Sequence, residues 1–99
     1  MSKVTKTLDH ILRGDSDAGV RFEELRNLLL RLNFQERIRG DHHIMTREGV
    51  VEILNLQPRG SMAKAYQVKQ VRGIIVAYGL AGELARNVAD GDDPSGDQS

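Results

Sequence analysis

Residues 35–56 read QERIRGDHHIMTREGVVEILNL, and the pattern of this segment indicates a small β-sheet. Three short segments, Gln35 to Arg39, His42 to Thr46 and Val51 to Leu56, have the residue content of β-strands. Both connections contain a glycine, one near Gly40-Asp41 and one near Arg47-Glu48-Gly49, and glycine favours tight turns. The stretch therefore predicts a three-stranded antiparallel meander.

Helical patterns lie on both sides of this predicted sheet. Before it, apolar residues recur at three- and four-residue steps from Phe22 to Leu32, with charged residues between them. After it, apolar residues from Val68 to Tyr78 repeat with the same period, and Gly79 is placed to end the helix. The sequence thus predicts an α+β domain in which a helix, a three-stranded sheet and a second helix follow one another.

An N-terminal helical arm and linker is expected over residues 1–19. Thr5 or Thr7 is expected to cap a short helix there, and Gly14 to end it. The turn-forming residues that follow Gly14 separate this arm from the main domain, which we place at residues 20–80.

The C-terminal end of the chain differs in charge from the rest. A helical extension is expected over residues 81–89, followed by a disordered acidic tail over residues 90–99. The tail holds four of the fourteen acidic residues and no lysine or arginine, so the remainder carries fourteen basic and ten acidic residues, although the formal net charge is zero. This surplus suits a polyanion such as RNA, but it also lies within the ordinary scatter of soluble domains.

Composition excludes several classes of protein. With 99 residues and 39% hydrophobic content, the chain suffices for one domain with one core. Without cysteine it has no disulfide framework and no thiolate metal site. No apolar run approaches the roughly 20 residues that cross a bilayer, and the first residues are too polar for a secretory signal. We expect a cytoplasmic protein without membrane contact.

His42 and His43 are the residues best suited to chemistry. Side chains alternate across a strand, so the two histidines should lie on opposite faces, with His43 sharing the inward face of Met45 and His42 on the open face. An exposed histidine can take a proton from a ribose 2′-hydroxyl or give one to a leaving oxygen, which would make RNA the substrate. The plain alternative is a polar surface pair. Metal binding is not expected, because Asp41 and His10 give no recognised ligand spacing.

The order of whole segments resembles the HicA toxin family of bacterial toxin–antitoxin systems. The resemblance covers residues 20–80 and includes a box similar to the family's Gly-Ser-His-x-x-aromatic motif. The segments that carry it are Phe22-Glu23-Glu24-Leu25, Leu29 with Arg31-Leu32-Asn33-Phe34, Arg39-Gly40-Asp41-His42-His43-Ile44-Met45, Leu54-Asn55-Leu56-Gln57 and Ala63-Lys64-Ala65-Tyr66-Gln67-Val68-Lys69-Gln70-Val71-Arg72.

This resemblance implies a fold like that of double-stranded-RNA-binding domains and a metal-independent, cofactor-free cleavage of mRNA. The catalytic histidine of the box corresponds to His42. The resemblance also implies an antitoxin of the HicB type, a separate chain that covers this histidine, and no DNA contact by this chain alone. Asp41 stands where the family usually has serine, and its carboxylate would either orient His42 or repel the phosphate.

Basic residues around the box are the candidate RNA contacts. We expect contacts from residues on or beside the hairpin of His42 and in the loop before the last helix, with the alternative that they only solvate strand edges and helix ends. The candidates are Arg37, Arg39, His43, Arg47, Arg59 and Lys64, with Gly40 and Asp41 as motif residues. An RNA-binding module without catalysis, or a protein-binding one on the same scaffold, remains an alternative to the ribonuclease.

Overall fold

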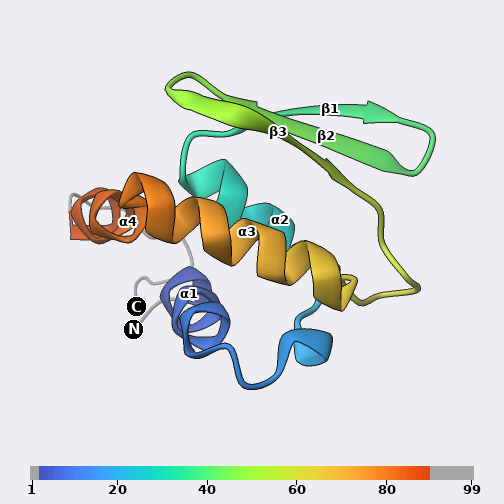
Figure 1. Ribbon diagram of the computed structural model, residues 1–99, viewed down its shortest axis with the longest axis horizontal. Helices are drawn as coiled ribbons and strands as arrows, with labels where there is room; N and C mark the ends of the chain where they lie inside the picture. Colours follow the sequence, from blue (N-terminus) through green and yellow to red (C-terminus); the bar gives the residue numbers. More distant parts are fainter. Residues whose placement is uncertain (1–2, 90–99) are drawn as a thin grey trace.

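A three-stranded sheet lies against a layer of helices in the computed structural model, which describes residues 3–89, with backbone only for residues 85–89 (Figure 1). The predicted order of helix, three strands and helix is confirmed, and it is extended at both ends. The elements are α1 (Lys3–Arg13), the 3₁₀ turn η1 (Asp17–Gly19), α2 (Phe22–Arg31), β1 (Gln35–Arg39), β2 (His42–Arg47), β3 (Val50–Leu56), α3 (Ala65–Tyr78) and α4 (Leu80–Ala89).

The sheet is the predicted antiparallel meander, in the order β1-β2-β3. In the first hairpin Arg39 pairs with His42 across a turn in which Gly40 has φ 61°. In the second hairpin Gly49 has φ 91°, a backbone conformation that glycine adopts without steric cost. The register therefore fixes which side chains share a face.

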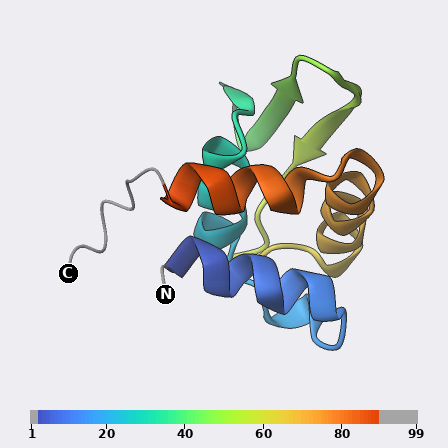
Figure 2. The same cartoon turned by 90° about the vertical axis from the view of Figure 1, so that its left-hand side faces the viewer.

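One face of the sheet is buried and the other carries no helix (Figures 1 and 2). Met45, Leu54 and Leu56 point toward the helices and are fully buried. Each is flanked along its strand by residues of the opposite parity, which form the open face. That open face carries a mixed set of polar and apolar side chains from all three strands, namely Gln35, Arg37, Arg39, His42, Ile44, Thr46, Val51, Ile53 and Asn55.

The C-terminal end of α1 agrees with the prediction at Gly14, and its N-terminal end differs. Gly14 follows α1 with φ 71°, and Asn33 follows α2 in the left-handed conformation with φ 70°. The expectation that Thr5 or Thr7 caps α1 is wrong, because α1 already includes Lys3 and both threonines lie inside it. The Thr7 hydroxyl instead donates to the Lys3 carbonyl one turn earlier (3.0 Å).

The terminal helices belong to the same hydrophobic core as the central unit. Leu8 and Ile11 of α1, and Leu80 and Leu84 at the start of α4, are buried with the core residues of α2, α3 and the sheet. The N-terminal segment is thus packed against the domain, and the helical extension predicted over 81–89 is present as part of α4. The predicted acidic tail lies outside the described residues.

Within residues 3–89, no helix is both long enough and apolar enough to cross a bilayer.

Candidate functional site

His42 lies where strand alternation places it, on the open face of the sheet at the start of β2. About half of its side chain is exposed (49%). Its Nδ1 is 3.1 Å from the Asn55 Oδ1 on β3, and Arg39 is its direct cross-strand partner on β1. Because directly paired residues lie on the same face, His42 sits between Arg39 and Asn55.

The contact with Asn55 fixes which ring nitrogen is free. With the Asn55 carbonyl oxygen as acceptor, Nδ1 of His42 is the donor, so Nε2 carries the lone pair of the neutral ring. Nε2 is 3.8 Å from the Asp41 Oδ1. Asn55 therefore orients the imidazole and leaves Nε2 available for proton transfer.

Asp41 is held by a neighbour and is ionised at neutral pH. The Gln57 side-chain amide donates to the Asp41 Oδ2 (2.8 Å), and this hydrogen bond is the main cause that lowers the pKa of the Asp41 carboxyl, with smaller contributions from His42 and Lys64. One oxygen of the carboxylate thus accepts from Gln57 while the other lies nearest to His42.

Lys64 reaches the same corner from a different part of the chain. Its Nζ donates to the Gln57 Oε1 (3.0 Å), so one amide side chain links Asp41 in the first hairpin to the residue that precedes α3. Sequence reasoning named Lys64 and Asp41 but did not identify Gln57 or Asn55 as site residues. The sequence does contain a signal for both residues: Asn55 and Gln57 are polar and alternate with the buried Leu54 and Leu56 at the end of β3.

His43 faces the helices, as predicted from its parity with Met45. Its Nδ1 is 2.7 Å from the Glu36 Oε2, and its ring meets Phe22 edge-on at a centroid separation of 4.8 Å. Glu36 also accepts two bonds from the Arg26 guanidinium (2.6 and 2.8 Å). His43, a candidate RNA contact, thus belongs to a network that joins the sheet to α2. It lies on the opposite face of the sheet from His42.

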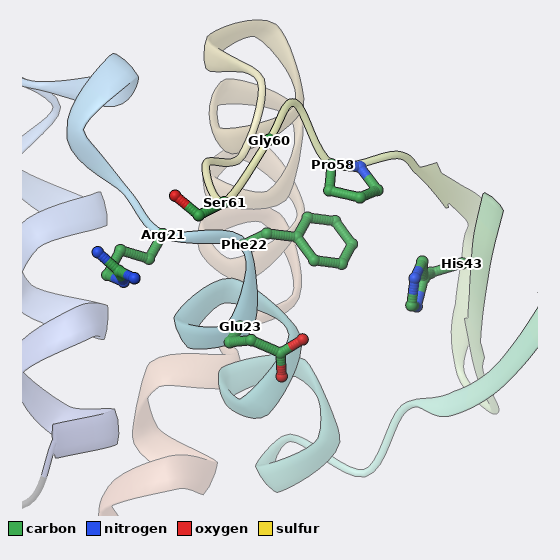
Figure 3. A pocket seen from close by; sticks show the side chains of 7 residues that line it. All are labelled: Arg21, Phe22, Glu23, His43, Pro58, Gly60 and Ser61. Carbon is green, nitrogen blue, oxygen red and sulfur yellow. The ribbon is translucent and has the colours of Figure 1, made fainter. Parts of the chain in front are cut away.

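A cavity of about 220 Å³ lies on this inner side of the sheet (Figure 3). The rings of His43 and Phe22, which are in contact, form part of its wall together with Pro58. Because His43 lines it, the cavity lies on the side of the sheet opposite His42 and is separate from the open-face site. Its complete lining is Arg21, Phe22, Glu23, His43, Pro58, Gly60 and Ser61.

The other candidate RNA contacts divide into two groups. Arg37 and Arg39 are exposed on the same face as His42, and Arg59 is exposed in the loop before α3. Arg47, in contrast, donates both to the Oε1 and to the Oε2 of Glu83 on α4 (2.6 and 2.8 Å), and its side chain is only 15% exposed. The structure therefore keeps Arg47 out of the surface around His42.

No metal site accompanies these residues: in the part of the chain that the structure describes, His, Asp and Glu nowhere form a group of three that could hold an ion. The groups gathered around His42 are its oriented imidazole, the ionised Asp41 carboxylate and the Lys64 ammonium. Comparison with family models, with curated proteins and with solved structures finds no match to this chain.

Proposed function

We propose that this protein is a HicA-like ribonuclease that cleaves mRNA with His42, on a fold of the double-stranded-RNA-binding-domain type. The observation that carries the proposal is the presentation of His42 on the open face, with Nδ1 hydrogen bonded to Asn55 and Nε2 beyond hydrogen-bond distance of Asp41 (3.8 Å). The helix, antiparallel sheet and helix, with both helices on one sheet face, agree with that fold type.

The chemistry follows from the free lone pair on Nε2. His42 takes the proton of a ribose 2′-hydroxyl, the 2′-oxygen forms a bond to phosphorus, and the bond from phosphorus to the 5′-oxygen breaks. A water molecule gives its proton to the leaving 5′-oxygen, and the resulting hydroxide deprotonates the imidazolium. The products are a 2′,3′-cyclic phosphate and a 5′-hydroxyl, which DNA cannot give because it lacks the 2′-hydroxyl.

Cations near His42 supply attraction for the RNA backbone. Arg37 and Arg39 share its face, and within residues 3–84 neither has an ion-pair partner. Arg59 and Lys64 come from the loop that borders the Asp41 corner. Affinity for RNA should therefore fall steeply with salt.

RNA binding without cleavage is the second candidate, and Asp41 favours it. An ionised carboxylate 3.8 Å from the Nε2 of His42 places negative charge where a phosphate must approach. This alternative predicts salt-sensitive binding of RNA and no products.

Incubation of the purified protein with an mRNA transcript in EDTA separates the two. Cleavage that ends in 2′,3′-cyclic phosphates, and its loss in His42→Ala, supports the ribonuclease. His10→Ala is the matched control, because His10 lies on α1, which α2 and α3 separate from the sheet (Figure 1), and its Nε2 is 3.0 Å from the Ser16 carbonyl oxygen. Intact RNA with the parent protein, or equal cleavage by His42→Ala, refutes catalysis.

A HicB-type antitoxin is the proposed protein partner. The open face that presents His42 also carries Val51 and Ile53, whose side chains are among the most exposed large apolar ones (87% and 63%). A partner that covers these residues would bury apolar area and block His42 together. Val51→Asp with Ile53→Asp should abolish copurification with the antitoxin while RNA cleavage persists; copurification equal to the parent refutes this surface.

A further inference from the structure

Three segments meet at the Gln57 side chain. Gln57 follows β3, Asp41 lies in the first hairpin, and Lys64 precedes α3. The Gln57 amide donates through Nε2 to Asp41 (2.8 Å) and accepts through Oε1 from Lys64 (3.0 Å), so both ends of the amide are used. An amide bonded at both ends has one orientation.

The backbone of this corner is anchored from below by Gln67, a buried polar residue of α3. Its Oε1 accepts from the Gln57 backbone N–H (3.3 Å), and its Nε2 donates to the Asn55 carbonyl (3.0 Å). Gln67 thus ties the segment that carries Asn55 and Gln57 to the helix that begins directly after Lys64. Asn55, which contacts His42, and Gln57, which contacts Lys64, therefore lie on one backbone segment that Gln67 holds in place.

We propose that Gln57 is a positioning residue that holds the Lys64 ammonium on the phosphate cleaved at His42. This inference rests on the proposed function. A lysine ammonium has three N–H donors, and Gln57 takes one, which leaves two for a non-bridging phosphate oxygen. Asp41 then acts mainly as the acceptor that orients Gln57.

The catalytic effect of Lys64 comes from charge that develops during the reaction. As the 2′-oxygen adds to phosphorus, negative charge grows on the non-bridging oxygens, and a fixed cation stabilises that state more than the bound substrate. Loss of Lys64 should therefore lower kcat more than it weakens binding. The same holds for Gln57, because it acts through Lys64.

The test is a double-mutant cycle in RNA cleavage. Lys64→Ala should lower kcat roughly 100-fold, the effect of removing one transition-state donor, and Gln57→Ala about 10-fold. The double variant should resemble Lys64→Ala within about 3-fold, because Gln57 has no role once Lys64 is absent. Asp41→Asn, which keeps an acceptor oxygen for Gln57, should lose less activity than Asp41→Ala. Lys69→Ala, an exposed lysine on α3, is the matched control.

A substrate with sulfur in place of the 5′-oxygen tests the role of Lys64 itself. Sulfur leaves without a proton, so a charge-stabilising Lys64 predicts the same loss with both substrates, and recovery of Lys64→Ala on the sulfur substrate overturns that role. Additive effects of Gln57→Ala and Lys64→Ala overturn the positioning role. A parent protein that fails to cleave RNA removes the proposed function as well, whereas His42-dependent cleavage with an additive cycle removes this inference alone.

Discussion

Replacing Glu36 by glutamine tests how firmly the sheet is fastened to α2. The Glu36 carboxylate accepts two bonds from Arg26 and is hydrogen bonded to His43, and its side chain is only 9% exposed. Glutamine offers one carbonyl oxygen, and its NH₂ group would face N–H groups of Arg26 or His43. Glu36→Gln therefore removes the negative charge that pairs with Arg26, and it places a hydrogen-bond donor opposite the N–H donors of Arg26 or His43.

The expected cost follows from these contacts. A hydrogen bond to a charged group contributes about 1.5–3 kcal/mol, and removal of one partner of a buried ion pair costs about 3–5 kcal/mol. About a quarter of the Arg26 side chain is exposed (27%), so its guanidinium can be rehydrated. We therefore expect Glu36→Gln to lower the free energy of unfolding by about 2–3 kcal/mol, and Tm by about 10–20 °C.

Urea and thermal unfolding followed by circular dichroism measure this loss. Glu23→Gln is the matched control, because Glu23 contacts the same guanidinium (3.2 Å) but is 70% exposed, so its loss should stay below about 0.5 kcal/mol. A Glu23→Gln effect as large as that of Glu36→Gln would refute the reasoning.

Low pH should reduce the difference in the free energy of unfolding between the parent protein and Glu36→Gln. The hydrogen bonds from Arg26, followed by His43, hold the pKa of the Glu36 carboxyl below its ordinary value of 4.5. A lowered folded-state pKa contributes stability that is fully present above the unfolded-state pKa and is lost as the pH falls through the folded-state pKa. The free energies of unfolding of the parent and of Glu36→Gln should therefore converge as the pH falls below 4.5 and through the lowered folded-state pKa.

Two further substitutions test the core and α3. Gly73→Ala should stabilise the protein by about 0.5–1 kcal/mol, because the added methyl group in this helix interior would meet no atom within 4 Å apart from its chain neighbours and the helix's own backbone; a lower urea midpoint would contradict this. Met45→Ala should cost about 2–5 kcal/mol in urea unfolding, since Met45 is fully buried, whereas the exposed Ile53→Ala should change little. Similar losses for Met45→Ala and Ile53→Ala would place Met45 outside the core.

The sheet could be predicted because its signals are local. The turn glycines lie within two residues of the strand ends, and the parity of His42, His43 and Met45 depends only on the alternation of a strand. Asn33 likewise reports its left-handed conformation through its own residue type. Such features need no knowledge of distant segments.

The polar contacts of the site could not be predicted, because they join residues far apart in the chain. Gln57 and Asp41, which are hydrogen bonded, are 16 positions apart in the sequence, and Arg47 and Glu83 are 36 positions apart. Nothing in the hairpin sequence distinguishes Arg47, which is withdrawn to α4, from Arg39, which remains exposed. The prediction that a threonine such as Thr7 caps α1 was wrong because a threonine inside a helix can donate a hydrogen bond to a carbonyl of the preceding turn as readily as it can cap a helix.

The fastening of His43 also limits how an activity at His42 can be controlled. Glu36 and Phe22 contact the His43 side chain on the helix side of the sheet and thereby hold the backbone between the two histidines. The His42 imidazole on the opposite face is therefore ordered before any substrate arrives. We therefore expect disorder at the site to accompany loss of the packing between the sheet and α2. An activity at His42 would then follow the folded fraction of the protein.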